Sequence, residues 1–340
     1  MSTADRYREA GVDLDAADLA KRRIAAAVES TRTELSRGLV GAFGGMLRMP
    51  DGIRQPTLVM STDGVGTKVL VAIRASRHDT VGEDLVNHSV NDILVHGATP
   101  LAFLDYIASA DASADTIAAL VEGVARGCRE HAMTLVGGET AQLPDLYHPG
   151  HYDLAGTIIG VVAEDRALHG DRVRVGDVLV GYASSGLHTN GYTLARRIVF
   201  DDLRLDVHDE LPALGVSVGD ALLAVHRSYR PAIVPVLDRV HALAHITGGG
   251  IPGNLARSLP AGCAARVDRT RWDVPGLFRL LERAGKVGPD EMYHVFNMGI
   301  GMIASVAADD VGGARAAAAA AGVETWEIGE IVTGEGVQLV

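Results

Sequence analysis

Several features are scarce in this 340-residue sequence, and each absence excludes a class of protein. It has two cysteines, Cys128 and Cys263, which are far apart and outside any metal-binding spacing, so neither a disulfide framework nor a zinc site is indicated. No apolar run reaches the roughly 18 residues that cross a bilayer, and the N-terminus is charged rather than signal-like. We therefore expect a cytoplasmic protein with no membrane partner.

The sequence also lacks an excess of positive charge. Its formal net charge is −12, from 31 Lys and Arg against 43 Asp and Glu. Nucleic-acid binding needs clustered basic residues, so we expect no nucleic-acid partner. Small anionic ligands are still compatible with this charge, because backbone amides, helix N-termini and a few local cations can hold them.

Hydrophobic residues, in contrast, are plentiful at 47% of the chain. Such a chain can bury a sizeable core, and single cores rarely grow beyond about 250 residues. The composition changes at the charged, turn-rich stretch 164–177. We therefore predict two α/β domains, residues 1–168 and 169–340.

The segment Leu58–Lys68 indicates a phosphate site. An apolar strand-like run opens there into Gly64 and Gly66, whose freedom to adopt positive φ lets backbone N–H groups turn toward an anion. Asp63 could hold Mg²⁺, and Lys68 would supply a point charge. An ordinary tight turn with solvated side chains is the alternative interpretation.

The segment Asp84–His96 has the apolar spacing of an amphipathic helix. Asn87 and Asn91 are four residues apart and so share a helix face, with Asp92 beside them. A solvated polar stripe is the alternative, but polar groups close to the apolar face favour a site, because leaving them unpaired would be costly.

A further carboxylate follows another predicted strand. Thr134–Gly138 is expected to be a short strand that ends in glycines, and Glu139 comes directly after it. Open α/β sheets bind ligands at strand ends. Glu139 therefore joins Asp63 and Asp92 as a candidate metal or nucleotide contact.

In the second half, a predicted strand at Val178–Ala183 leads into Ser184–Gly191, which contains hydroxyls, an imidazole, an amide and two glycines. A helical pattern, Tyr192–Val199, follows. A helix N-terminus favours an anion, so this segment is a candidate site for a phosphate ester. An elaborate helix cap is the alternative, although a cap needs only one Ser or Thr.

A glycine-rich segment, Ala244–Gly253, also follows a short apolar run. It matches a dinucleotide-binding pattern formally, with Asp268 about twenty residues further on, but no repeated βαβ units surround it, so we disfavour that hypothesis. His245 should lie at a strand end and face the cleft. We predict that it assists proton transfer, because an unperturbed imidazole titrates near neutrality; a structural hydrogen bond is the alternative.

Near the N-terminus, a charged, Ala-rich helix is predicted from Ala16 to about Leu35. Four glycines among apolar residues follow in the segment Gly38–Met46. Next to a nucleotide site, such a segment can act as a lid. A packed surface loop is equally compatible with the sequence.

Taken together and in order, these motifs resemble phosphoribosylformylglycinamidine cyclo-ligases, also called aminoimidazole ribonucleotide synthetases. The resemblance covers nearly the whole chain, beginning at Tyr7–Asp13, and it rests on these motifs: S-T-D-G-V-G-T-K, V-N-D-I-L, G-G-E-T-A, D-L-A-G-T, S-S-G-L-H-T-N-G-Y, H-I-T-G-G-G and F-N-M-G-I-G. Their common order is more specific than any one of them.

The resemblance implies a two-domain α/β fold whose N-terminal sheet domain pairs with its twin in a homodimer, followed by a C-terminal α/β domain. It also implies a reaction of purine biosynthesis. ATP phosphorylates the amide oxygen of formylglycinamidine ribonucleotide, and an amidine nitrogen attacks that carbon. The ring of 5-aminoimidazole ribonucleotide closes, and ADP and phosphate are released. Such chemistry depends mainly on positioning and charge neutralisation.

The resemblance further implies a role for each motif residue, with ATP and Mg²⁺ as cofactors. ATP contacts are expected at Gly44, Gly45, Asp63, Gly64, Gly66, Thr67, Lys68 and Asn91. Substrate contacts are expected at Ser185, His188, Thr189, Asn190, Gly191, Thr247 and Gly248. The metal ligands would be Asp63, Asp92 and Glu139, and the catalytic residues His245 and Lys68.

Two residues depart from the expected pattern. Gln142 stands where an acidic residue often follows G-G-E-T-A, and His96 stands where glutamine is common. Related families are disfavoured. Selenophosphate synthetases and hydrogenase maturation factors need a terminal-region cysteine that this chain lacks, and thiamine monophosphate kinases lack two of the motifs in this form. A non-catalytic nucleotide-binding module is disfavoured because every candidate carboxylate and Lys68 are present.

Overall fold

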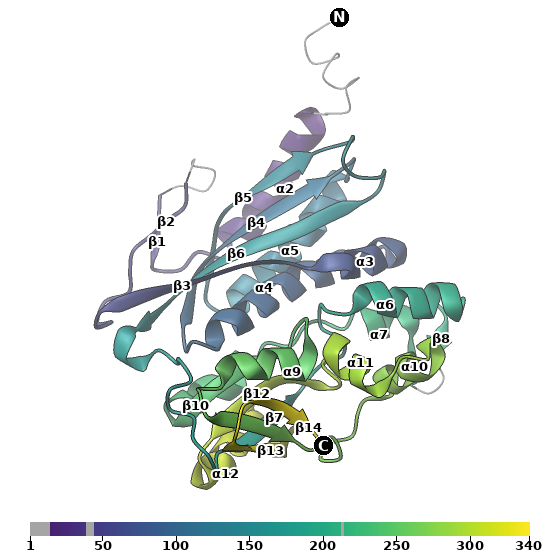
Figure 1. Ribbon diagram of the computed structural model, residues 1–340. Coiled ribbons are helices and arrows are strands. Elements are labelled where there is room, and N and C mark those ends of the chain that lie inside the picture. The colour runs from purple at the N-terminus through teal and green to yellow at the C-terminus, as the bar shows by residue number, and fades with distance from the viewer. Residues whose placement is uncertain (1–13, 39–43, 212–213) are drawn as a thin grey trace, which may run out of the picture.

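The computed structural model describes residues 14–38, 44–211 and 214–340. Tyr7–Asp13 and the middle of the predicted lid therefore lie outside the described residues. Two sheets, one from each half of the chain, lie one above the other with helices between them (Figure 1). Among the described helices, none is long and apolar enough to cross a membrane.

The described chain begins with helix α2, Leu14–Glu29, which packs on α5. The sequence predicted that this helix would continue to about Leu35. It ends earlier because the hydroxyls of Ser30 and Thr31 donate to carbonyls of its last turn. A small antiparallel hairpin follows, formed by β1 (residues 36–37) and β2 (residues 46–47).

The first sheet has its strands in the order β3, β6, β4, β5. The bounds are Pro56–Gly64 for β3, Thr99–Ser109 for β4, Thr134–Gln142 for β5 and Tyr152–Ala163 for β6. Strands β3 and β4 run antiparallel to β6, whereas β4 and β5 are parallel. Helices α2, α4 and α5 lie behind this sheet in Figure 1, and no helix of the described residues covers its opposite face.

Helix α4, Asp79–Leu94, is the central element of the structure. It packs on α5 (Ala114–Glu130), on the first sheet and on elements of the second half, and α3 (Val69–Ala75) precedes it. The predicted helix is present here, but almost all of its residues are buried. Its polar side chains therefore form no solvated face and need partners inside the protein.

The second sheet has six strands in the order β10, β12, β7, β13, β11, β14. The bounds are Val178–Ala183 for β7, Val240–His245 for β10, Cys263–Val267 for β11, Ile300–Val306 for β12, Thr325–Thr333 for β13 and Gly336–Leu339 for β14. All neighbours are antiparallel except β11 and β14.

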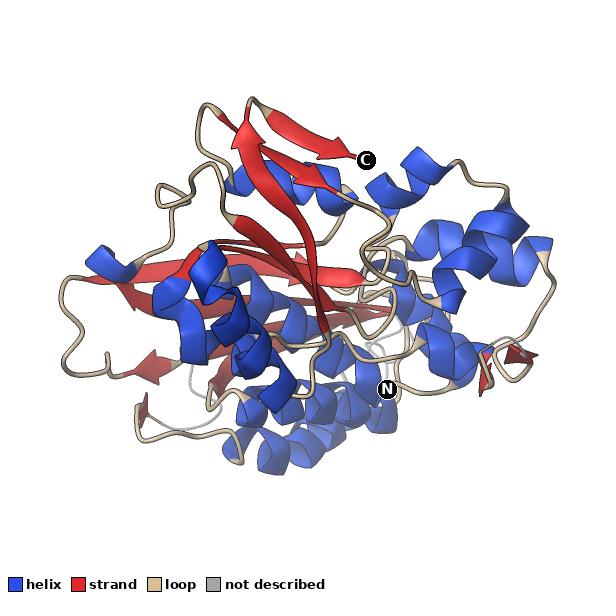
Figure 2. Ribbon diagram, turned by 90° about the horizontal axis from the view of Figure 1, so that it is seen from below, coloured by secondary structure: helices blue, strands red, loops and turns tan. Residues whose placement is uncertain are grey.

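Short helices surround the second sheet. Their bounds are Tyr192–Arg196 for α6, Val218–Leu222 for α7, Arg230–Ile233 for α8, Gly250–Leu255 for α9, Gly276–Gly285 for α10, Pro289–Val295 for α11 and Val311–Ala320 for α12. Figure 1 shows α9 above the sheet and α12 below it, and Figure 2, seen from below, shows further helices gathered beside one edge. A two-residue hairpin, β8 (210–211) with β9 (216–217), precedes α7.

The order of strands in the second sheet also tests the hypothesis that the glycine-rich segment Ala244–Gly253 binds a dinucleotide. Strands β10 and β11 flank the glycine-rich segment, but β12, β7 and β13 lie between them in the sheet. They therefore form no βαβ unit, which a dinucleotide-binding segment requires. The structure supports our rejection of that hypothesis.

The apolar core continues from one half into the other. One cluster of buried side chains includes Leu85 and Phe103 in the first half and Leu187 and Tyr192 in the second. A separate cluster lies between the second sheet and α8 and α12. The shared cluster fixes the two halves against each other, so residues from both can line one site.

Candidate active site

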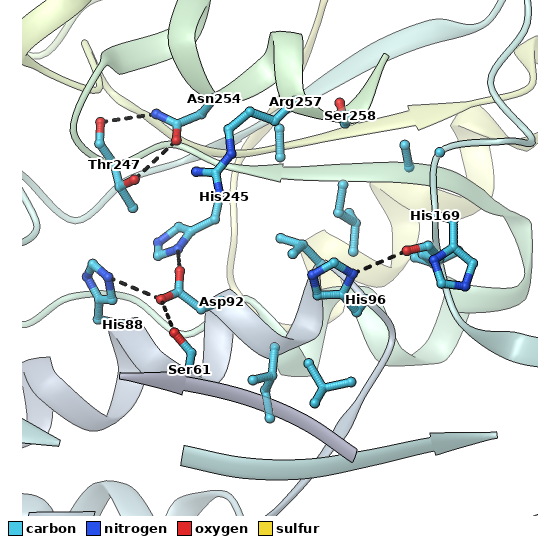
Figure 3. Close-up of a pocket in the computed structure, with 18 of the residues that line it drawn as sticks. Ser61, His88, Asp92, His96, His169, His245, Thr247, Asn254, Arg257 and Ser258 are labelled. Atoms are coloured by element: carbon cyan, nitrogen blue, oxygen red, sulfur yellow. Dashed lines mark hydrogen bonds and ion pairs between the residues drawn. The ribbon is translucent and has the colours of Figure 1, made fainter. Parts of the chain in front are cut away.

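A pocket of about 540 Å³ lies between the two halves of the chain. Its wall in the first half comes from β3 and α4, and its wall in the second half comes from β10 and from the turns at both ends of α9. The polar lining residues labelled in Figure 3 are Ser61, His88, Asp92, His96, His169, His245, Thr247, Asn254, Arg257 and Ser258. Asp63 also lines the pocket.

Five side chains from both halves form a closed ring of hydrogen bonds at one end of this pocket. His88 Nδ1 lies 2.8 Å from Thr189 Oγ1, which is 3.4 Å from His226 Nδ1. His226 Nε2 lies 3.1 Å from His245 Nε2, whose Nδ1 is 2.8 Å from Asp92 Oδ1. Asp92 Oδ2 closes the ring at 3.4 Å from His88 Nε2. The ring joins α4 to three segments of the second half.

Two proton positions in this ring follow from Asp92 and Asp63, because an ionised carboxylate can only accept hydrogen bonds. His245 Nδ1 donates to Asp92, so the Nε2 of a neutral His245 can only accept. His226 Nε2 lies 3.1 Å from that acceptor and 3.2 Å from the donor Asn91 Nδ2, so its role differs between the two tautomers of His226. His88 Nδ1 lies 2.8 Å from the Thr189 hydroxyl and donates to it when His88 is protonated. His88 Nε2 must also donate, because it faces carboxylates. The carboxylates therefore place a proton on His88 Nε2 and another on His245 Nδ1.

Burial and neighbouring charges also favour a protonated His88, an ionised Asp92 and a neutral His245. Burial alone would lower the pKa of His88, but its hydrogen bonds with Asp63 and Asp92 outweigh burial and raise that pKa to about 9. Burial would raise the pKa of Asp92, whereas its bonds to His245 and His88 hold it well below its usual value. Burial lowers the pKa of His245, so that imidazole is neutral at pH 7.

The loop that carries His226, residues 224–229, is fastened to α4 by buried side chains. Asp84 Oδ1 accepts from the His226 backbone N–H at 2.6 Å, and Asn87 Nδ2 donates to the His226 carbonyl at 2.8 Å. Asn91 Nδ2 donates to another carbonyl of the loop at 2.8 Å, and its Oδ1 accepts a backbone N–H at 2.9 Å. The polar residues of α4 therefore serve the contact between the two halves.

This arrangement changes the interpretation of Lys68 and Asn91, which were predicted to contact ATP. Lys68 Nζ lies 2.7 Å from Asp84 Oδ2 and donates to the Ala224 carbonyl at 2.7 Å, and its side chain is 0% exposed. Asn91 is also 0% exposed, with both ends of its amide engaged by the loop. Neither side chain is free for a phosphate, because both bind the loop.

Glu139 lies far from the other two predicted metal ligands. It stands on β5, and strands β6 and β4 separate it from β3. The register places Asp63 level with Gly138, so three strand spacings, about 14 Å, separate Asp63 from Glu139. The sequence predicted a strand end at Gly138, but parallel pairing with β4 carries β5 on to Gln142. Within one chain, therefore, Glu139 cannot share an ion with Asp63 and Asp92.

Asp63 and Asp92, in contrast, lie together. Their Oδ2 atoms are 2.8 and 3.4 Å from the same nitrogen, His88 Nε2, and the Asp63 side chain is 46% exposed. Adjacent carboxylates at an open pocket suit Mg²⁺, which prefers oxygen ligands and keeps several waters. A second cluster, His188 with His226 and His245, suits a metal poorly. Two of its rings are stacked at 4.0 Å with a 22° interplanar angle, so their lone pairs do not converge.

The predicted substrate loop is mostly engaged within the protein. Ser185 Oγ donates to a backbone carbonyl at 2.5 Å, His188 is 0% exposed, and Thr189 belongs to the ring. Asn190 and Gly191 follow, and none of these five residues lines the pocket. Gly191 lies against an aromatic ring, so it serves packing. Ser185 and Thr189 have partners within the protein, whereas His188 Nδ1 and Asn190 Nδ2 are buried without one. The contact of this loop with a phosphate ester stays a prediction.

Of the other residues predicted to contact ATP or substrate, some line the pocket and some do not. His245 is the last residue of β10 and lines the pocket, so its predicted position is confirmed. Thr247 also lines the pocket, next to Gly248. Outside the pocket lining lie Gly44, Gly45, Gly64, Gly66 and Thr67. Their contact with ATP stays a prediction.

The sequence analysis missed four residues that the structure places in or around the site. Asp84 and His226 belong to the fastening of α4, and neither lies in a glycine-rich motif. His88 could have been found, because it precedes Asp92 by one helical turn on a helix full of apolar residues. Arg257 lines the pocket three residues after Asn254, beyond the motif that drew attention to this segment.

Comparison with known proteins gives consistent likenesses over nearly the whole chain. Residues 46–162 match the family model described as AIR synthase related protein, N-terminal domain, and residues 174–340 match the corresponding C-terminal domain. A phosphoribosylformylglycinamidine cyclo-ligase from Sorangium cellulosum is 46% identical over 96% of this chain and 95% of its own length. One from Anaeromyxobacter sp. (strain K) is 48% identical over 96% of both chains.

Solved structures with the same fold are more distant in sequence. Thiamine-monophosphate kinase from Stenotrophomonas maltophilia K279a has a TM-score of 0.71 at 21% identity, covering 94% of this chain and 95% of its own. E. coli HypE has a TM-score of 0.67 at 18% identity, covering 95% and 93%. These likenesses confirm the predicted α/β fold class.

Proposed function

The chain belongs to the phosphoribosylformylglycinamidine cyclo-ligase family of purine biosynthesis, and from this premise we propose that the pocket between its two halves is where it closes the imidazole ring. The reaction is the ATP-dependent cyclisation of formylglycinamidine ribonucleotide to 5-aminoimidazole ribonucleotide, with release of ADP and phosphate. The observation that carries the proposal is the ring of His88, Thr189, His226, His245 and Asp92, which joins acid–base groups from both halves at one pocket.

The chemistry needs two kinds of group. The amide oxygen becomes a leaving group only after phosphorylation, and that transfer depends on neutralising negative charge. Asp63 and Asp92 would hold the Mg²⁺ that supplies this neutralisation together with ATP. Their adjacent oxygens at the pocket wall support this assignment.

Ring closure also needs a proton acceptor, because the attacking amidine nitrogen must lose a proton. His245 is our proposed acceptor, since it lines the pocket and burial keeps it neutral at pH 7. Its Nε2 lies 3.1 Å from His226 Nε2 and would exchange that contact for the substrate nitrogen. Its hydrogen bond to Asp92 orients the imidazole, and Asp92 can stabilise the imidazolium that forms. Such positioned acid–base help typically contributes about 10²- to 10⁴-fold in rate.

We propose that a second copy of the chain covers the open face of the first sheet. Leu58 and Met60 on β3 are 46% and 64% exposed, and Tyr106 on β4 is 41% exposed. The register places all three on the same face of the sheet, with Tyr106 level with Gly64 and two strands from β3. A monomer rarely leaves several large apolar side chains of one face in water. Sedimentation should give a dimer for the wild-type chain and a monomer for Met60→Lys. We further propose that the dimer works in the cytoplasm, with Cys128 and Cys263 as free thiols.

ADP release tests the proposed function, measured with and without formylglycinamidine ribonucleotide. The proposal expects ADP to appear only when the ribonucleotide is present, together with an equal amount of the imidazole product. Ribonucleotide-independent ATP hydrolysis, or phosphorylation of the ribonucleotide without cyclisation, would contradict it. Asp92→Asn provides the matched control, because it keeps the size of the side chain and removes its charge.

A further inference from the structure

Two histidines and one carboxylate bring their donor atoms together at the ring end of the pocket. His88, Asp92 and His245 each offer one ligand atom there, and these atoms all lie within 4.8 Å of one another. His88 Nε2 is 3.4 Å from Asp92 Oδ2, and His245 Nδ1 is 2.8 Å from Asp92 Oδ1. The ligands of a tetrahedral zinc ion, each about 2.0 to 2.1 Å from the metal, lie about 3.3 Å apart. Small side-chain movements therefore bring the three atoms onto one ion.

Regular elements of both halves hold these three side chains in place. His88 and Asp92 are four residues apart on α4, so they project from the same face of the helix. His245 is the last residue of β10, and both histidines are buried. Figure 3 shows the two imidazoles turned toward the Asp92 carboxylate from different directions. The ligand set is thus formed before any ion binds.

The second nitrogen of each histidine has a partner of the kind that orients a metal ligand. His88 Nδ1 lies 2.8 Å from the Thr189 hydroxyl, and His245 Nε2 lies 3.1 Å from His226 Nε2. Histidines that bind a metal almost always donate their other N–H to such a partner, which fixes the tautomer and the orientation of the ring. The surroundings of both histidines therefore fit a metal site.

A hydrogen-bond conflict at His226 points to a cation beside His245. Asn91 Oδ1 accepts a backbone N–H at 2.9 Å and its Nδ2 donates to a backbone carbonyl at 2.8 Å, so the orientation of this amide is fixed. Its Nδ2 therefore faces His226 Nε2 as a donor at 3.2 Å. While His245 Nδ1 donates to Asp92, either tautomer of His226 leaves one contact unsatisfied. If His226 Nε2 accepts, it meets the lone pair of His245 Nε2, and if it donates, it meets the amide N–H.

A metal ion on His245 Nδ1 removes this conflict. The ion takes the lone pair of Nδ1, so the one proton of a neutral His245 lies on Nε2 and is donated to His226 Nε2. His226 Nε2 can then accept from His245 and from Asn91 together. A second proton on His245 would satisfy the same contacts, but it would place a cationic imidazole 5.1 Å from the cationic ring of His88.

The chemistry of the donor set decides which metal fits. Mg²⁺ prefers oxygen ligands alone, whereas imidazole together with carboxylate suits Zn²⁺ and the neighbouring divalent transition metals. The three residues line an open pocket, so a further position remains for water or for Asp63 Oδ2, which lies 2.8 Å from His88 Nε2. We propose that His88, Asp92 and His245 form a binding site for a divalent transition-metal ion of the zinc class. The set contains no cysteine, so cysteine spacing could not indicate it.

Occupation of this site would stop the proposed reaction. The ion would take the Asp92 oxygens that are assigned to Mg²⁺. It would also leave the proton of His245 on Nε2, the atom that has to accept a proton from the substrate. Zn²⁺ should therefore inhibit cyclisation, and a chelator should restore it. This consequence rests on the proposed function, whereas the site itself does not.

The visible absorption of Co²⁺ tests the site in untagged protein freed of metal. Co²⁺ bound by few ligands of low symmetry absorbs far more strongly than the six-coordinate ion in water. The wild-type chain should give this strong absorption, Zn²⁺ should abolish it, and an excess of Mg²⁺ should not. Only the weak absorption of six-coordinate Co²⁺ in the wild-type chain would overturn the proposal.

A matched pair of variants locates the ion. Loss of an outer partner alone costs about 10- to 100-fold in metal affinity, so His245→Asn should weaken Co²⁺ binding at least that much. His148→Asn is the control, because the exposed His148 lies beside His151, with ring centroids 5.7 Å apart, in a possible surface site. Equal binding by wild type and His245→Asn would overturn the proposal. So would a loss confined to His148→Asn.

Electron paramagnetic resonance of Cu²⁺ in His148→Asn keeps the test independent of the folding of His245→Asn. The spectrum should show coupling to two imidazole nitrogens, and coupling to fewer than two would overturn the site. Assays with formylglycinamidine ribonucleotide then separate the site from the function. His245-dependent binding of Co²⁺ in a chain that does not cyclise, or that cyclises unimpeded with Zn²⁺ bound, would uphold the site and contradict the proposed function or the role of His245 in it. Absence of such binding would overturn the site, even if cyclisation is observed.

Discussion

Replacing Lys68 by methionine distinguishes a structural role for this lysine from a role on ATP phosphates. The sequence suggested contact with phosphate, whereas the structure pairs Lys68 with Asp84 inside the contact between the halves. Lys68 Nζ lies 2.9 and 2.7 Å from the two Asp84 oxygens, and both side chains are 0% exposed. The substitution keeps most of the volume of the side chain and removes its charge.

The loss of stability expected in Lys68→Met follows from the charge of Asp84, which stays buried without its partner. Removing one partner of a buried ion pair costs about 3 to 5 kcal/mol, because the other charge stays buried and unpaired. The Ala224 carbonyl also loses its donor, which adds about 1 kcal/mol. In Lys68→Met/Asp84→Leu no buried charge is left, and the main remaining loss is the acceptor of the His226 N–H, about 1 to 3 kcal/mol. The double variant should therefore be more stable than Lys68→Met by about 2 kcal/mol.

Scanning calorimetry and the cyclisation assay together check this prediction. The unfolding temperature should fall most in Lys68→Met and recover in the double variant, and the KM for ATP should remain near the wild-type value in both. Because Asp84 also positions His226, kcat should fall in both variants. A Lys68→Met protein with wild-type stability and a strongly raised KM for ATP would refute the structural role.

Three further predictions concern the ring and Asp63 beside it. His245→Ala should lower kcat by about 10²- to 10⁴-fold with unchanged ATP binding, and a His245→Asn enzyme with wild-type kcat across neutral pH would show that His245 is only structural. Asp63→Asn and Asp92→Asn should each raise the Mg²⁺ concentration needed for half-maximal rate severalfold or more, and normal activity of the double variant at ordinary Mg²⁺ would contradict the assignment. His88 has a folded pKa of about 9, above its unfolded value, so its ion pairs stabilise the fold at pH 6 and this contribution is lost as pH rises through 9. Histidine NMR should show His88 titrating near pH 9 in wild type and lower in Asp92→Asn.

Much of the fold could be predicted from the sequence. Apolar runs and glycine turns located the strands β3 and β7 to within a few residues, because a strand and its turn are encoded locally. The position of His245 at the end of β10 followed in the same way. The motif order indicated the family, because order and spacing over a whole chain are far more specific than any single motif.

The partners of the site residues could not be predicted, since they depend on contacts between the halves. Lys68 and Asp84 are sixteen residues apart in sequence, but the loop that both bind is more than 130 residues further on. Nothing local distinguishes a buried lysine that binds such a loop from one that binds phosphate. Glu139 shows the same limit, because its distance from Asp63 depends on the strand order β3, β6, β4, β5, which no local pattern encodes.

The fate of the substrate's amide oxygen tests the central claim most directly. If the pocket activates this oxygen by phosphorylation and then closes the ring, formylglycinamidine ribonucleotide labelled with oxygen-18 at the amide must transfer its label to the released phosphate. Mass spectrometry should find one labelled oxygen in each phosphate and none in 5-aminoimidazole ribonucleotide. Unlabelled phosphate, with the label released into water, would contradict the account, because the ring would then have closed without a phosphorylated amide.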